Sequence, residues 1–271
     1  MPEGSPEFLL AFVLLESAAL PDFTALRASP WASRHEISWD EPKDGIALFT
    51  LDGAEAHIAL MPAPVPWSDL ELPCAASRFW REATDVCRKH QAHLVVALRS
   101  AEPDPVTRHL LLTEFVAALL EATPAALAVY WGNGGVVQST EIFREFSAAA
   151  TPNDLPLYLW VDFRLWRQEA GGLYIATTGL EPFGVMELEG TTRRLDPQTL
   201  MGKVYDLAHY VCQNGPVLAD GDTIGESATE RIRIRHAPSV WQRGQVVRID
   251  FDGPERKGPG KLIQGLFGRG N

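Results

Sequence analysis

Apolar and polar positions along the chain follow two different periods, and no internal repeat is present. Alternation of apolar and polar residues, or a short apolar run, indicates a β-strand, whereas a period of 3.6 residues indicates a helix. These patterns predict strands at 8–16, 36–39, 46–51, 55–61, 94–98, 127–131, 136–137, 157–166, 174–178, 186–188, near Thr223, at 230–235 and at 245–251. They predict helices at 22–28, 74–89, 107–122, 139–150 and 195–213.

Turn and capping residues support several of these boundaries. Asp52-Gly53 lies between two apolar runs, which is the clearest hairpin signal in the chain. Ser139 is expected to cap one helix, and Asp196 followed by Pro197 is expected to begin another. Residues 62–73 carry four prolines, so we predict that they form a loop or a broken turn.

The mixture of helices, strands and hairpins predicts the α+β class. We expect a mixed, partly antiparallel sheet with helices packed on it, in a single compact body that ends in a small β segment. The length of 271 residues allows one large domain or two small ones. We predict one domain over residues 8–251, because no linker divides this part of the sequence. Residues 1–7 are either a cloning remnant or a disordered start. Residues 252–271 are rich in glycine and net basic, and we predict a flexible tail there.

Charge and cysteine content narrow the possible partners and the compartment. The chain has 24 basic and 35 acidic residues, a net charge of −11, which repels phosphate backbones and anionic membranes. Three widely spaced cysteines do not make a disulfide framework and suit a reducing cytosol. The apolar run at 8–15 is too short to cross a bilayer. We therefore expect a cytoplasmic protein with no nucleic-acid partner and no membrane insertion.

The predicted strand at 157–166 supplies the first candidate binding surface. Alternation places four side chains on one of its faces: Trp160, Asp162, Arg164 and Trp166. Two tryptophans on either side of an Asp/Arg pair suit a planar or sugar-like ligand, or a protein partner. The alternative is an ion pair on a half-covered sheet face.

A second candidate surface is a strand in which arginines alternate with isoleucines. Arg231, Arg233 and Arg235 are expected to share one face, where they could receive a carboxylate or a phosphate. The alternative is a solvated strand face that pairs with the acidic residues of the protein itself.

The sequence contains few residues with the spacing of a metal site and none of the familiar enzyme motifs that we searched for. Cys87, His90 and His93 have a spacing that hints at a metal, but on a helix residue 93 would lie about 120° from residue 87. We therefore expect no metal and no cofactor, and we interpret these histidines as residues near a helix C-terminus. The chain contains no G-x-S-x-G, H-E-x-x-H or C-x-x-C motif. Glu181, Glu187 and Glu189 flank a turn and are candidates for paired carboxylates.

Several blocks of sequence resemble a known bacterial family. They are FVLLESAALPDF near the start, GLEPFGVMELE at 179–189, DPQTLMGKVYDLAHYVCQNGPVL, and DGDTIGESATERIRIRHAPSVWQRGQVVRIDF. Over roughly residues 8–251 the chain resembles the family catalogued as domain of unknown function 4261. The resemblance implies a cytosolic bacterial protein of mixed α and β structure, associated with toxin–immunity and secretion genes. It implies no activity, ligand or catalytic residue.

Two hypotheses for the function follow. The first is a non-enzymatic protein-binding factor, either immunity-like or a toxin- or secretion-associated accessory protein, whose acidic body attracts a basic partner such as a cationic toxin. The second is a hydrolase or transferase with no recognisable motif, which needs a cleft that brings together groups such as His57, His209, Asp162 or Arg164. We favour the first hypothesis and leave the question of an enzyme open.

Overall fold

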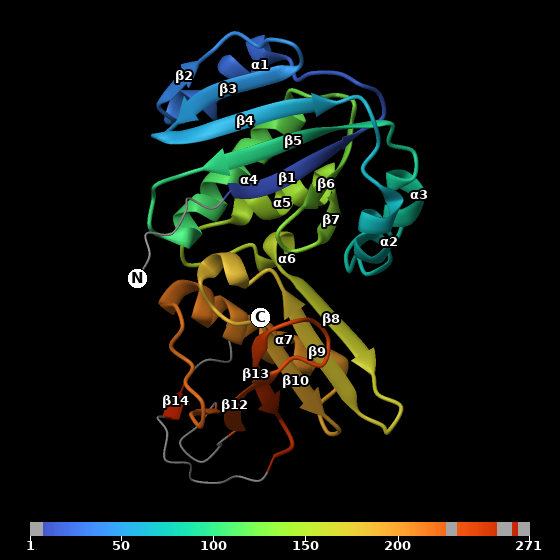
Figure 1. Ribbon diagram of the computed structural model, residues 1–271, viewed down its shortest axis with the longest axis vertical. Coiled ribbons are helices and arrows are strands. Elements are labelled where there is room, and N and C mark those ends of the chain that lie inside the picture. The colour runs from blue at the N-terminus through green and yellow to red at the C-terminus, as the bar shows by residue number, and fades with distance from the viewer. Residues whose placement is uncertain (1–7, 226–231, 254–261, 265–271) are drawn as a thin grey trace. The chain divides into compact units, whose positions relative to one another are not determined.

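The computed structural model describes residues 8–225, 232–253 and 262–264 (Figure 1). These residues form helices and two seven-stranded sheets, which confirms the predicted α+β class. Contacts divide the chain into two compact units, unit 1 (Met1–Trp160) and unit 2 (Val161–Asn271). The single domain expected over residues 8–251 remains a prediction. Within the described ranges, no helix combines the length and the apolar character needed to cross a bilayer.

Unit 1 is built on an antiparallel sheet of strand order β2-β3-β4-β5-β1-β6-β7. The strands are β1 (Phe8–Leu15), β2 (Ile37–Trp39), β3 (Ile46–Leu51), β4 (Ala54–Met61), β5 (Ala92–Arg99), β6 (Ala126–Trp131) and β7 (Val136–Ser139). The helices are α1 (Phe23–Arg27), a 3-10 turn at Ala32–Arg34, α2 (Trp67–Ala75), α3 (Ala83–Cys87), α4 (Pro105–Glu121), α5 (Thr140–Ala149) and α6 (Leu157–Trp160).

Helices cover both faces of the unit 1 sheet. On β6, Trp131 packs against Phe143 of α5 and Trp160 of α6. The neighbouring residue Tyr130 points to the other face and packs against the cluster that contains Leu70 of α2. Strand alternation therefore separates two cores, one on each side of the same sheet.

Two predictions for unit 1 are wrong. The segment at 62–73 is not all loop, because α2 begins at Trp67, and the helix expected at 74–89 is reduced to the end of α2 and the short α3. Pro66 precedes the first turn of α2, and Pro73 removes only one hydrogen bond near its end, so the prolines do not prevent the helix.

The strand expected at 157–166 is also wrong in its first half. Leu157–Trp160 is the helix α6, and the strand begins only at Asp162. The run of apolar residues there does not distinguish a strand from a buried helical turn by periodicity alone. Three of the four residues of α6, Trp160 among them, are buried.

Unit 2 is built on a mixed sheet of strand order β14-β11-β12-β13-β10-β9-β8. The strands are β8 (Asp162–Arg167), β9 (Leu173–Thr178), β10 (Leu188–Thr192), β11 (Thr223–Gly225), β12 (Ile232–Pro238), β13 (Gln245–Asp250) and β14 (Leu262–Gln264), with a 3-10 turn at Glu181–Phe183. The long helix α7 (Pro197–Asn214) packs on one face, where its Tyr205 contacts Phe163 of β8 with ring centroids 5.6 Å apart.

Local signals located helix starts accurately. The Asp196 carboxylate accepts hydrogen bonds from the backbone N–H groups of Gln198 and Thr199, so it caps α7 as predicted. Ser139 caps α5 in the same way by accepting from the N–H of Ile142. These capping interactions depend only on neighbours in sequence, which explains why the sequence alone predicts them.

Gly190 lies where β10 is most tightly packed. A Cβ atom at this position would lie 2.9 Å from Cε2 of Phe251 and 3.0 Å from Cγ2 of Ile175. Contacts this short require a neighbour to move, so the packing of unit 2 requires glycine here.

Candidate functional site

A row of charged side chains crosses the face of the unit 2 sheet that α7 does not cover. Arg164 of β8 pairs with Ala176 of β9, and Ala176 pairs in turn with Glu189 of β10. Glu189 pairs with Arg248 of β13, which pairs with Arg235 of β12. Residues paired across neighbouring strands point to the same face. The two surfaces predicted from sequence, on β8 and on β12, therefore lie on one face of one sheet.

Glu189 is the buried centre of this row, with 1% of its surface exposed. Its carboxylate accepts hydrogen bonds from the Ser239 hydroxyl, from the backbone N–H of Val240 at 3.2 Å and from Nη2 of Arg248 at 3.1 Å. Burial alone would raise the pKa of Glu189, but the hydrogen bonds from Ser239 and Arg248 and the charge of Arg248 lower it below its ordinary value. Glu189 is therefore held as a carboxylate that ties the loop 239–244 to the sheet.

The loop 239–244 carries an aromatic contact to the far edge of the sheet. The Trp241 ring lies 4.9 Å from the Trp166 ring of β8, and Trp166 lies 4.6 Å from the Tyr174 ring. The Arg164 guanidinium lies 5.4 Å from the centre of the Trp241 ring, within cation–π range. Despite these contacts, Trp241 is 43% exposed and Val240 is 68% exposed. Large apolar side chains thus remain open to solvent on an anchored loop.

The first sequence-predicted surface is only partly assembled as expected. Asp162 and Arg164 form an ion pair at 2.7 Å, with Trp166 on the same face of β8. Burial raises the pKa of Asp162, against the opposing charge and hydrogen bond of Arg164. Trp160 does not belong to this face, because it lies in α6 of unit 1, where its Nε1 donates to the Thr113 hydroxyl at 2.8 Å.

The second surface has the predicted alternation wherever the structure describes it. Arg233 and Arg235 are exposed, whereas Ile232 and Ile234 are buried. Arg231 lies outside the described residues. Neither Arg233 nor Arg235 forms an ion pair within the part of the chain that the structure describes. The expected alternative, pairing with the protein's own acidic residues, is not found for these two arginines there.

The histidines of the weak metal candidate bind backbone groups. Nε2 of His90 accepts from the N–H of Val65 at 2.9 Å, and its Nδ1 contacts the carbonyl oxygen of Cys87. Nδ1 of His93 lies 2.8 Å from the carbonyl oxygen of Ala63. Over the described ranges, no group of three or more His, Cys, Asp or Glu side chains is arranged to hold a metal ion.

Two of the three glutamates considered as paired carboxylates, Glu187 and Glu189, bind different partners. Glu187 accepts from the Thr177 hydroxyl at 2.6 Å and from the N–H groups of Gly179 and Leu180, both at 2.8 Å. Burial raises the pKa of Glu187, while these hydrogen bonds oppose the shift. Glu187 therefore fixes the turn before β10, whereas Glu189 fixes the loop 239–244.

The residues proposed for an enzyme are not gathered in unit 2. His209 belongs to α7, and α7 covers the face opposite to that of Asp162 and Arg164. His57 belongs to β4 of unit 1, where it packs edge-on against Phe8. A histidine next to the Asp162–Arg164 pair, which acid–base catalysis would use, is therefore not provided by His209.

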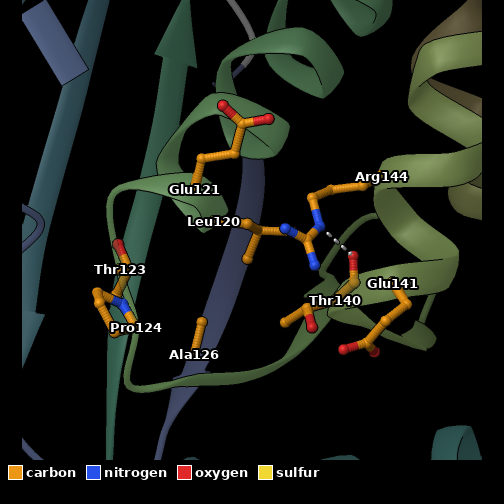
Figure 2. Close-up of a pocket in the computed structure, with 8 residues that line it drawn as sticks. All are labelled: Leu120, Glu121, Thr123, Pro124, Ala126, Thr140, Glu141 and Arg144. Carbon is orange, nitrogen blue, oxygen red and sulfur yellow. Dashed lines mark hydrogen bonds between the residues drawn. The ribbon is translucent and has the colours of Figure 1, made fainter. Parts of the chain in front are cut away.

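A separate open pocket of about 380 Å³ lies in unit 1 between the end of α4 and the start of α5 (Figure 2). Glu121, Glu141 and Arg144 are its charged residues. Nε of Arg144 donates to the carbonyl oxygen of Thr140 at 3.3 Å, and Figure 2 shows its guanidinium extending toward Leu120. The pocket is polar and open, and it contains no histidine or cysteine that would suggest chemistry.

Comparison with known proteins identifies one segment of unit 2. Residues 176–250 match the family model described as domain of unknown function (DUF4261), whereas no curated protein and no solved structure matches the chain. The matched segment contains Glu189, Arg248, the loop 239–244 and the exposed arginines of β12, but not Asp162, Arg164 or Trp166. This match confirms the predicted resemblance to the family over residues 176–250.

Proposed function

We propose that the chain is a non-enzymatic protein-binding factor, immunity-like or associated with toxins or secretion, and that the loop 239–244 contacts its partner. The observation that supports this proposal is the exposure of Val240 and Trp241 on a loop that a buried carboxylate holds in place. Neighbouring exposed apolar side chains mark interaction sites, and tryptophan is prominent among the residues that dominate binding energies.

The anchoring of the loop favours binding. Ser239 bonds to Glu189, and its hydroxyl oxygen accepts from the N–H groups of Trp241 and Gln242 at 3.0 and 2.8 Å. The loop is therefore ordered before a partner arrives, which lowers the conformational entropy lost on association. A surface built in this way binds more tightly than a flexible loop with the same side chains.

The charge of the chain supports a partner of the opposite sign. A net charge of −11 steers a basic protein, such as a cationic toxin, and raises the association rate. The enzyme hypothesis has less support, because the charged groups near Trp241 bind one another: Asp162 pairs with Arg164, and Glu189 with Arg248.

An affinity pull-down with matched variants tests the proposal. The wild-type chain, Trp241→Ala and Leu72→Ser serve as baits for a lysate of the organism that encodes the chain, with mass spectrometry of the captured proteins. Leu72 is an exposed apolar residue of α2, 61% exposed, so it controls for general stickiness. A stoichiometric partner should bind the wild type and Leu72→Ser but not Trp241→Ala. The proposal would be contradicted if Trp241→Ala still captured the partner, or if no stoichiometric partner were captured at all. The second outcome would favour the enzyme hypothesis.

A further inference from the structure

The hairpin formed by β12, the loop 239–244 and β13 has a charge opposite to that of the chain. Between residues 232 and 250 the sequence contains four arginines, Arg233, Arg235, Arg243 and Arg248, and one acidic residue, Asp250 at the end of β13. The chain as a whole is at −11. This hairpin is therefore a local basic surface on an acidic protein.

Three of the four arginines are not neutralised by the described parts of the protein. Arg248 is paired with Glu189, but Arg233, Arg235 and Arg243 are exposed and form no ion pair in the ranges that the structure describes. Exposed guanidinium groups without a partner bind carboxylates readily, because they present several N–H donors in a planar fork.

The apolar and basic parts of this surface are separated by a distance that suits a peptide. The arginines of β12 and the Trp241–Trp166 contact at β8 are four strand spacings apart, about 19 Å at ~4.8 Å per spacing. An extended segment of about six residues covers that length. The covered strip would have guanidinium groups at one end and the exposed Trp241 at the other.

We propose that the hairpin at 232–250 binds an acidic segment of a partner protein, with carboxylates on Arg233 and Arg235 and an apolar side chain against Trp241. This inference rests on the proposed protein-binding function and specifies the chemistry of the contact. The inference is compatible with a partner that is basic overall. Electrostatic steering depends on the net charge of the whole partner, whereas this contact depends on the charge of one segment.

A nucleic acid fits this surface less well than an acidic protein segment. The net charge of −11 opposes the approach of a long polyanion, and binding of nucleic acids normally relies on many phosphate contacts with an extended basic surface. The exposed Val240 also favours an apolar side chain of a protein over a phosphate backbone.

Selection from a random 12-residue peptide library displayed on phage, against the immobilised full chain, tests the inference. Enriched peptides should combine Asp or Glu with a large apolar residue, and their affinity should fall as salt rises. For one enriched peptide, the dissociation constant should rise about tenfold or more in Arg233→Glu/Arg235→Glu and in Trp241→Ala. Arg167→Glu/Arg194→Glu reverses two exposed arginines outside the hairpin and should change it less than about twofold.

The outcomes separate the inference from the proposed function. Two results would overturn the acidic contact and leave the proposed protein binding intact. In the first, the peptides bind Arg233→Glu/Arg235→Glu as well as the wild type but do not bind Trp241→Ala. In the second, the enriched peptides are basic. The inference would also be overturned if no peptide is enriched from the library. The same holds if peptides do not bind but a 20-nucleotide single-stranded DNA binds and requires the arginines. If neither the peptide nor the partner captured from lysate depends on Trp241, the proposed function fails as well.

Discussion

Replacing Glu189 with glutamine is the sharpest test of how the loop 239–244 is held. The substitution preserves the volume of the side chain and removes its negative charge. The charged carboxylate accepts hydrogen bonds from the Ser239 hydroxyl, the Val240 N–H and the Arg248 guanidinium. Removing one partner from a buried ion pair costs about 3–5 kcal/mol. The Arg248 side chain is 31% exposed, so water can partly solvate its guanidinium once the carboxylate is gone. We therefore expect a loss of about 2–3 kcal/mol of unfolding free energy.

Two measurements report on this change. Urea unfolding followed by tryptophan fluorescence gives the free energy, and hydrogen exchange followed by mass spectrometry reports on the loop itself. The N–H groups of Val240, Trp241 and Gln242 should exchange faster in Glu189→Gln, because their acceptors are Glu189 and the Ser239 hydroxyl that Glu189 orients. Glu169→Gln, an exposed position in the turn between β8 and β9, should change neither quantity.

The pH dependence of the unfolding free energy is a second test of the role of Glu189. The pKa of Glu189 is lowered in the folded protein, so its contribution to stability is complete above the unfolded value of about 4.3 and is lost as pH falls through the lower folded value. The difference in unfolding free energy between wild type and Glu189→Gln should therefore shrink on acidification through that window. Equal stability at pH 7 together with unchanged loop exchange would refute the role assigned to Glu189.

Three further experiments test the packing of the two units, each by itself. Burial lowers the pKa of His109 to about 3. The unfolding free energy should therefore fall by up to about 1.4 kcal/mol per pH unit below pH ~6.5, where the unfolded chain binds the proton. Urea titrations at pH 7 and pH 5 should show a smaller fall in His109→Gln than in the wild type. Gly190→Ala should lose about 1–3 kcal/mol in thermal melts through overpacking, whereas Gly202→Ala, whose Cβ would meet nothing, should gain up to ~1 kcal/mol in α7. Trp160→Phe should lose about 1–2 kcal/mol, and a double-mutant cycle with Thr113→Val should be non-additive, because both changes remove the Trp160–Thr113 hydrogen bond. Thr113→Val has a further cost of its own, since the Thr113 hydroxyl also donates to the His109 carbonyl oxygen.

Local interactions account for what the sequence predicted well. The hairpin of β3 and β4 was predicted from Asp52-Gly53, and Asp52 does adopt a positive φ of 49°. The caps of α5 and α7 were predicted from single residues for the same reason. The helix α6 was missed because its formation is set by distant partners, among them the Thr113 hydroxyl that receives the Trp160 indole N–H. Burial of this kind leaves no periodic signal in a run of four residues.

The candidate site illustrates the same limit. The arginines of β12 and the Asp162–Arg164 pair stand out in the sequence, but only strand register shows that they share a face, because three strands separate β8 from β12. Glu189 could be noticed only as one acidic residue among 35, and its role depends on a loop about 50 residues later. Trp241 is one of eight tryptophans in the sequence and was not singled out.

The arrangement around Glu189 gives a physical reason to regard the loop 239–244 as a binding surface. Burying a carboxylate has a desolvation cost that only several donors offset, and a hydrophobic substitute is often equally stable. If holding the hairpin closed were the whole role, turning Trp241 inward would stabilise the unit further, since a buried aromatic ring contributes more than a half-exposed one. An arrangement that fixes the backbone strongly and leaves Val240 and Trp241 exposed, beside arginines without ion-pair partners in the described residues, sacrifices stability for an accessible surface. Such an accessible surface contributes to binding only when a partner covers it.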